Sequence, residues 1–337
     1  MTTEVPTEMT AIEIIDPGGP EALKPGIRAV PTPGDGEVLV KVVAAGVNFP
    51  DVMQRRGNYP PPPGASDIPG LEIAGVVVAI GDGVMEIQLG NHVCALVSGG
   101  GYAEYCAAPA AQCLPVPDNF EMVRAAAIPE TFFTVWTNLI DRGELRSGQW
   151  VLIHGGSGGI GTAAIQIAHA LGARVLATAR TAEKCAVCEK LGAARAINYA
   201  EEDFVEIAKV MTGGSGVELI IDKVGGDYGV RKLQALAPGG RLVQVAVQGG
   251  ASPEIPLFLI MQKHLTLTGS TLRPRSVAEK GAIAAALKER IWPGLDAGEL
   301  GPLVHATFPL SEAAKAHEMM ESSSHIGKIV LTVQNGG

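Results

Sequence analysis

WVLIHGGSGGIG, residues 150–161, sets a short apolar run directly before a glycine-rich turn. The residues after it place these apolar side chains on one helical face: Ile160, Ala164, Ile167, Ala168 and Leu171. Gly172 follows, as glycine often does where a helix ends. A strand, a glycine turn and an amphipathic helix in this order predict the opening unit of a doubly wound parallel sheet.

Downstream of this unit, strand-like and helix-like runs alternate along the chain. The expected strands are 175–178, 196–199, 217–222, 241–247 and 265–270, and the expected helices between them include 183–191, 204–211 and 229–236. This alternation predicts an α/β fold with a six-stranded parallel sheet over residues 131–272. The flanking residues 1–130 and 273–337 are expected to form a second, mainly β domain, with helices near 277–290 and 311–321 and a closing strand at 328–333.

The glycine turn has the spacing of a phosphate-binding loop, G-x-G-x-x-G. Its residues are Gly156, Ser157, Gly158, Gly159, Ile160 and Gly161. A side chain at Gly158 or Gly161 would obstruct a pyrophosphate or the packing of helix on strand. The unpaired N–H groups at the helix N-terminus favour an anion at the same place. The turn therefore predicts a dinucleotide site.

The end of the second expected strand indicates which dinucleotide is preferred. An NAD enzyme has Asp or Glu there to accept from the adenosine ribose. This chain has Ala179, followed by Arg180, Thr181 and Lys184. Two cations and a hydroxyl suit a 2′-phosphate, so we expect NADPH.

Composition excludes several other classes of protein. The 337 residues carry a net charge of −9, which disfavours nucleic-acid binding. No run approaches the roughly 20 apolar residues of a membrane span, and Glu4 and Glu8 do not suit a signal peptide. An odd number of cysteines, five, suits a reducing compartment, so we expect a cytoplasmic protein. The Cys185–Cys188 spacing has no second pair, and we expect both to be packing residues.

Four segments together resemble a known family: 44–57, 69–77, 148–166 and 325–331. They are similar to the zeta-crystallin-like quinone oxidoreductases of the medium-chain dehydrogenase/reductase superfamily, over about residues 9–333. His169 stands where that signature usually has a basic residue or Ser. Phe49-Pro50 replaces a more polar pair, which implies a more apolar substrate cleft.

The resemblance implies a GroES-like domain beside the Rossmann domain, with the cofactor and an acceptor in the cleft between them. The zinc-dependent branch of the superfamily would have Cys near Asn48, His in place of Leu71, and cysteines after Ala95. This chain has Asn48 and Leu71 at the first two positions, and residues 97–103 contain no cysteine. We therefore expect no metal site and direct hydride transfer. The family also implies a homodimer, formed through edge strands of the Rossmann sheets.

Site roles follow from the same resemblance. Asn48, Phe49 and Tyr59 would line the acceptor site, with Asn48 or Tyr59 donating a hydrogen bond to the acceptor oxygen. The expected cofactor contacts beyond the turn and the second strand are Thr134, Tyr199, Val245, Ala246, Ser270 and Leu272. Arg273 would face either the acceptor or the cofactor.

The expected reaction is reduction of a quinone by NADPH, with a small-molecule electron acceptor as the partner. Reduction of the activated double bond of an enone or enal has the same requirements, and the sequence does not separate the two. A cofactor-binding structural protein without turnover is a rival of another class. An RNA-binding protein conflicts with the acidic charge. No Ser/His/Asp or Cys/His pattern indicates a nucleophile.

Overall fold

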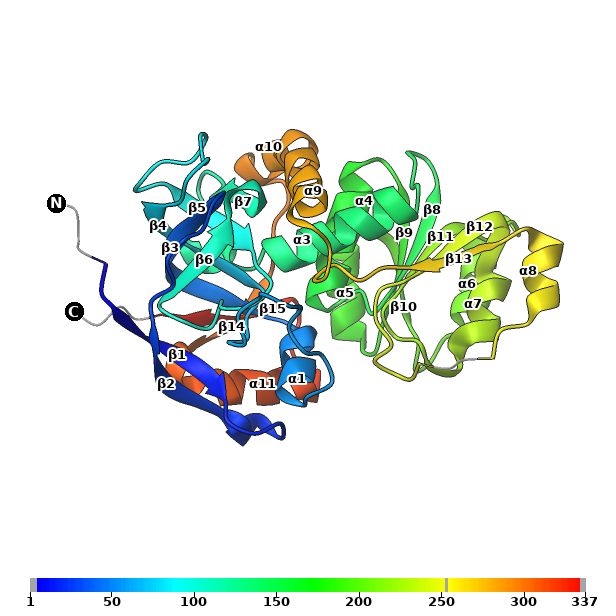
Figure 1. Cartoon of the computed structure of the whole chain (residues 1–337). Helices are drawn as coiled ribbons and strands as arrows, with labels where there is room; N and C mark the ends of the chain where they lie inside the picture. Colours follow the sequence, from blue (N-terminus) through cyan, green and yellow to red (C-terminus); the bar gives the residue numbers. More distant parts are fainter. Residues whose placement is uncertain (1–4, 252–253, 334–337) are drawn as a thin grey trace. The chain divides into compact units, whose positions relative to one another are not determined.

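The computed structural model describes residues 5–251 and 254–333, which divide into two compact units (Figure 1). The first unit comprises residues 1–133 and 272–337, and the second comprises residues 134–271. Helix α3 (Pro129–Trp136) contains the first of the two crossings between them, and a π-helical turn, η3 (Thr137–Arg142), continues it. Within the described residues, no helix is long and apolar enough to cross a membrane.

The first unit is built mainly from strands. Its seven-stranded sheet has the order β14-β15-β3-β4-β5-β7, with β6 paired to β3, and β1 and β2 form a separate antiparallel pair. The bounds are β1 (Glu8–Ile14), β2 (Leu23–Ala29), β3 (Glu37–Val47), β4 (Glu72–Ile80), β5 (His92–Leu96), β6 (Tyr105–Pro109), β7 (Cys113–Pro115), β14 (Val304–Pro309) and β15 (Lys328–Thr332). Its helices are α1 (Phe49–Arg55), α2 (Met122–Ala125), α9 (Val277–Arg290), α10 (Trp292–Asp296) and α11 (Ala313–Ser322).

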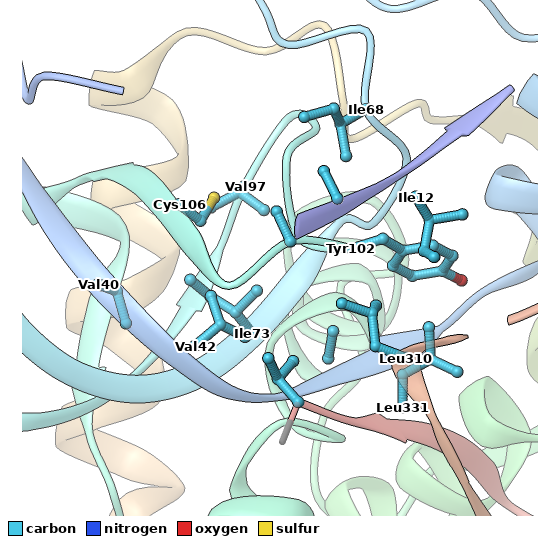
Figure 2. Close-up of a cluster of buried hydrophobic side chains, with 14 of the residues drawn as sticks. Ile12, Val40, Val42, Ile68, Ile73, Val97, Tyr102, Cys106, Leu310 and Leu331 are labelled. Carbon is cyan, nitrogen blue, oxygen red and sulfur yellow. The ribbon is translucent and has the colours of Figure 1, made fainter. Parts of the chain in front are cut away.

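The core of the first unit draws on both ends of the chain. Ile12 of β1 lies beside Tyr102, while Leu310 and Leu331 come from the C-terminal segment (Figure 2). The Tyr102 side chain is fully buried, although it carries a hydroxyl. Burial of that hydroxyl requires hydrogen-bond partners, which are described below.

The second unit is a parallel sheet in the order β10-β9-β8-β11-β12-β13. The strands are β8 (Trp150–His154), β9 (Arg174–Ala179), β10 (Ala193–Asn198), β11 (Val217–Asp222), β12 (Leu236–Gln244) and β13 (Thr266–Gly269). The helices are α4 (Gly159–Ala170), α5 (Ala182–Lys190), α6 (Phe204–Met211), α7 (Gly229–Ala235) and α8 (Leu257–Lys263). This doubly wound order reverses at β8, and it confirms the predicted Rossmann fold class.

Helices flank this sheet (Figure 1). Side chains of α6 and α7, among them Phe204 and Leu233, share one buried cluster with Leu152 and Ile220 of the sheet. Helices α4 and α5 contact β8, β9 and β10. Right-handed crossovers from a central first strand place the two groups of helices on opposite faces.

Strand boundaries in the Rossmann sheet differ from the sequence-based prediction, most of all at the starts of the fifth and third strands. The fifth strand of the Rossmann sheet was expected at 241–247, whereas β12 begins at Leu236 and ends at Gln244. Leu236 already pairs with Val217, and a register shift absorbs the residues between that pair and Arg241. The third strand ends at Asn198, so Tyr199 lies just beyond it.

Candidate functional site

The glycine turn joins β8 to α4 in the second unit. Gly155 has φ +72°, and Gly156 N donates to Thr178 O at 2.8 Å. A Cβ atom at Gly156 would lie 2.9 Å from the Cβ of Ala177 and from Sγ of Cys188, and one at Gly161 would clash with Gly155 O. These glycines therefore allow the backbone of the turn to pack against β9 and against itself.

The N-terminus of α4 remains suited to an anion. Its first N–H groups have no partner inside the helix, because an α-helix leaves its first four donors unpaired. Ser157 is 8% exposed, while Gly158, Gly159 and Ile160 are half-buried. A Cβ atom at Gly158 would clash only with the side-chain end of Lys223. The turn thus fits the pyrophosphate of a dinucleotide.

The residues at the end of β9 lie at the same carboxyl edge of the sheet. Ala179 is 2% exposed, and Arg180 is exposed beyond it. Thr181 is the N-cap of α5, with Oγ1 accepting from Lys184 N at 3.2 Å. Tyr199 N donates to Ala179 O at 3.1 Å, which holds Tyr199 next to this strand end. The structure thus brings these predicted cofactor residues together.

The remaining predicted cofactor residues are more dispersed. Val245 N donates to Asp222 O at 2.7 Å, so its N–H is already engaged, and Ala246 follows it. Ser270 lies beyond β13 and bonds Asn138 Oδ1 through its hydroxyl at 2.9 Å. Thr134, in α3, is 8% exposed. Leu272 belongs to the other unit, unlike the rest of the predicted set.

His154 ends β8 and is buried in the core. Its Nδ1 lies 3.1 Å from Thr178 Oγ1, but Nε2 has no partner among the described residues. Burial lowers the pKa of His154 to about 4, so the ring is neutral near pH 7. The ring packs edge-on against Phe204, in the core rather than in a catalytic arrangement.

Asn48 is the centre of a buried polar cluster in the first unit. Its Nδ2 donates to Glu72 Oε1 at 2.9 Å, and its Oδ1 accepts from Lys328 Nζ at 2.5 Å. Its backbone N–H donates to Asp51 Oδ2 at 2.8 Å in a capping box at the start of α1. Both ends of the Asn48 amide are hydrogen-bonded within the cluster. Of the two predicted donors to the acceptor oxygen, Tyr59 is therefore the more available. Lys328 was missed in the sequence, where it appears only as one cation before an apolar strand.

Two further groups extend this cluster. Tyr102 OH lies 3.1 Å from Asp51 Oδ2 and 3.1 Å from His317 Nε2, so its hydroxyl is satisfied. Burial raises the pKa of Asp51 to about 6. Burial and then the charge of Glu72 raise the pKa of Glu130 to about 8, so Glu130 carries a proton near pH 7. Glu130, in the first turn of α3, was also missed, since nothing in the sequence distinguishes it from a helix-start carboxylate.

Tyr59 is half-buried and is held by Arg273. The guanidinium carbon lies 5.3 Å from the Tyr59 ring centroid, and Nη1 donates to Tyr59 O at 3.2 Å. Arg273 is 5% exposed and also donates to Gln54 Oε1 and Ser98 O. Burial raises the pKa of the Tyr59 phenol, so it keeps its proton and can donate. Phe49 is half-buried at the first position of α1.

The chemistry of this cluster does not suit zinc. Asn48 offers an amide and Leu71 an aliphatic side chain at the positions where the zinc-dependent branch would have ligands. The ammonium of Lys328 lies between Asn48 and Glu72. Across residues 5–251 and 254–333, no group of three or more His, Cys, Asp and Glu side chains could hold a metal ion.

Family models match two stretches of the chain, and known proteins match almost all of it. Residues 34–118 match the model described as "Alcohol dehydrogenase GroES-like domain", and residues 159–288 match "Zinc-binding dehydrogenase". Human quinone oxidoreductase is 35% identical over 328 residues, which are 96% of this chain and 97% of that protein.

Solved structures agree on the fold and differ in the cofactor with which they are associated. A mycobacterial protein in complex with NADPH has a TM-score of 0.85 and 32% identity, covering 96% of this chain and 99% of its own. An NAD-dependent alcohol dehydrogenase has a TM-score of 0.84 and 32% identity, covering 97% of this chain and 100% of its own. Family and turn together indicate a nicotinamide cofactor. The chain is an oxidoreductase of the medium-chain dehydrogenase/reductase superfamily and belongs to its zeta-crystallin-like quinone oxidoreductase family.

Proposed function

We propose that the protein reduces quinones with NADPH and does so without zinc. The observation that carries this proposal is the buried cluster of Asn48, Glu72 and Lys328. An ammonium already neutralises the carboxylate that would otherwise attract a divalent cation. Reduction must then rely on direct hydride transfer, for which an electron-poor acceptor such as a quinone is suited.

The reduced nicotinamide supplies a hydride, and a quinone that takes this hydride and one proton becomes a hydroquinone. In the first unit, the phenol of Tyr59 is the group we assign to bind the acceptor oxygen while negative charge develops on it. Phe49 supplies apolar contact for a ring. The protonated carboxyl of Glu130 and the carboxylate of Asp51 are part of the electrostatic surroundings of Tyr59.

Preference for NADPH is supported by the end of β9. Arg180 is exposed there, Thr181 and Lys184 follow, and Ala179 provides no carboxylate to repel a 2′-phosphate. The NADPH complex of the mycobacterial relative is consistent with this choice.

An acceptor screen tests the proposed reaction. NADPH oxidation would be followed by absorbance with quinones, enones, enals and simple alcohol–aldehyde pairs. Turnover highest with quinones supports the proposal. Higher efficiency with enones would reassign the enzyme to double-bond reduction, and tight NADPH binding without any turnover would contradict an enzymatic role.

Zinc independence has its own measurement. We expect metal analysis of the purified protein to find well below one zinc per chain, and turnover to survive a strong chelator. About one zinc per chain together with chelator-sensitive turnover would overturn this part of the proposal.

We further propose a homodimer formed through the edge strand β13 and the neighbouring helix α8. β13 pairs only with β12 in the described sheet, so its other edge is open to a second copy. Helix α8 exposes large apolar side chains: Leu257 at 70%, Phe258 at 73% and Met261 at 71%. Light scattering after Phe258→Glu should show monomers, while Met85→Glu, at an even more exposed apolar side chain of the first unit, should leave dimers. Monomeric wild type would contradict the assignment.

We also propose that the protein is located in the cytoplasm, which is a reducing compartment. Its support is that all five cysteines are free thiols, four of them buried. Fractionation of the source cells with an antibody to the chain tests it.

A further inference from the structure

Lys223 lies across the glycine turn although it is far from the turn in sequence. It directly follows β11, which pairs in parallel with β8 in the register Ile221↔Ile153. Lys223 lies two residues beyond Ile221, and Gly155 lies two residues beyond Ile153. The register therefore places Lys223 and Gly155 side by side. A Cβ atom built on Gly155 would clash with Cε of Lys223, and one on Gly158 would clash with its Nζ. The ammonium therefore rests on the face of the turn that a phosphate would approach.

No described side chain gives this ammonium an anionic partner. Among the described residues, Lys223 Nζ has no hydrogen-bond acceptor and no carboxylate within ion-pair distance. The nearby carboxylate is that of Asp222, which directly precedes Lys223. It already pairs with the ammonium of Lys232 and accepts from the N–H groups of Val224 and Gly225. Lys232 also donates to Gly225 O at 2.9 Å, so it is fully engaged, unlike Lys223.

The groups that face Lys223 from α5 do not neutralise it. They are the ammonium of Lys184 and the thiol of Cys188, whose pKa burial raises to about 12, so the thiol is uncharged. Burial and the charge of Lys184 lower the pKa of Lys223 to about 8. An anion placed at the turn would relieve both effects, because it favours the charged form of the amine.

We propose that Lys223 binds the pyrophosphate of the nicotinamide dinucleotide, adding a mobile cation to the backbone donors of the turn. The inference rests on the proposed function. The pyrophosphate is preferred over the 2′-phosphate because Lys223 lies on Gly155 and Gly158, whereas Arg180 and Thr181 follow β9. The four-carbon side chain lets the ammonium move aside and contact the phosphate oxygens.

A dependence on pH follows from this contact. Bound pyrophosphate raises the pKa of Lys223 above its value of about 8 in the free protein. Affinity is then constant below pH 8 and falls as pH rises from 8 toward the pKa of the complex, because binding must take up a proton. The loss is the same for NADH and NADPH, since both carry the pyrophosphate.

The test is a fluorescence titration of NADH and NADPH, from about pH 7 to about pH 9.5, a range that spans the pKa of Lys223. Lys223→Met should weaken both dinucleotides about tenfold or more at the lower pH, and by the same factor. Lys223→Arg should keep the affinity and remove the decline above pH 8, because arginine does not titrate there. Lys190→Met removes an exposed ammonium from the end of α5 and should change neither affinity.

Other results overturn the inference. Unchanged or tighter binding by Lys223→Met would show that the ammonium is a bystander or obstructs the site. Weaker binding of NADPH alone would assign Lys223 to the 2′-phosphate. If Lys223→Met does not fold, as judged by circular dichroism, the test is the pH dependence of dinucleotide affinity in Lys223→Arg. Constant affinity above pH 8 supports the proposal, and a persisting decline in affinity contradicts it. Wild type that binds neither dinucleotide would instead refute the proposed function, and this inference with it.

Discussion

Lys328 Nζ lies 2.5 Å from Oε1 of Glu72, and their side chains are 3% and 0% exposed. The same carboxylate accepts from Asn48 Nδ2 and, through Oε2, from Glu130 N, each at 2.9 Å. Burial of two charges costs several kcal/mol each, and the close pair and its hydrogen bonds offset that cost. The pair is therefore a point at which the first unit is sensitive to single substitutions.

We expect Lys328→Met to lower the free energy of unfolding by about 3–5 kcal/mol, because it leaves the Glu72 carboxylate buried without its cation. Denaturant titration measures the change. Lys315→Met removes one partner of the exposed pair Lys315–Glu312, with side chains 62% and 39% exposed, and should cost less than about 1 kcal/mol. The double variant Glu72→Gln, Lys328→Met should be more stable than Lys328→Met alone. Equal effects at Lys328 and Lys315 would argue against a buried pair.

Gly158 and Gly161 should respond differently to valine. At Gly158 an added Cβ atom clashes only with the flexible end of Lys223, so Gly158→Val should fold but lose cofactor binding. At Gly161 they meet the backbone of Gly155 and Gly156, so Gly161→Val should also lose about 1–3 kcal/mol of stability. Thermal unfolding and NADPH titration of both variants separate the two effects. Normal NADPH affinity in Gly158→Val would show that the turn serves packing alone.

Arg180→Ala should weaken NADPH binding about ten- to a hundredfold, since a hydrogen bond to a charged group contributes roughly 1.5–3 kcal/mol. NADH lacks the 2′-phosphate and should be little affected. Arg174→Ala, at the opposite end of β9, is the matched control and should change neither. Adding Ala179→Asp should shift the preference toward NADH by providing a ribose acceptor. The ratio of kcat/KM for NADPH and NADH, measured in one buffer, reports the outcome, and equal loss for both cofactors would contradict it.

His317 should make the fold sensitive to acid. Burial, and then the charge of Arg55, lower the pKa of His317 to about 3, so the unfolded chain binds a proton that the folded chain does not. Stability is then fully present above pH 6.5 and falls as pH drops from 6.5 toward 3, by about 1.4 kcal/mol per pH unit from this group. His317→Gln should remove that contribution to the slope, whatever its effect on stability at pH 7. His92→Gln, at an exposed site, should leave the slope unchanged, and an unaltered slope in His317→Gln would refute the assignment.

Local pattern was sufficient for much of the fold. The predicted helices 204–211 and 277–290 coincide with α6 and α9, and the predicted strand 217–222 coincides with β11. Each depends on apolar spacing and on caps within a few residues, such as the capping box of Ser276 and Glu279. The start of β12 was wrong because Pro238-Gly239-Gly240 suggests a turn, whereas pairing of Leu236 with Val217 extends the strand.

The polar cluster of the first unit required the tertiary structure. Lys328 and Asn48 are 280 residues apart. They meet because β15 pairs antiparallel with β3, with Ile329 opposite Val47. A lone lysine before an apolar strand gives no sign of this pairing, since strand order is set by burial of whole faces and not by any one residue.

The sequence by itself determined the glycine turn, the parallel sheet around it and the family, because these depend on spacing between near neighbours. The tertiary structure decided what lies on the turn. Lys223 reaches Gly155 and Gly158 because β8 and β11 are adjacent in the sheet, although α4, β9, α5, β10 and α6 lie between them in the chain. Adjacent parallel strands end at the same edge, so side chains that follow them converge there whatever their separation in sequence.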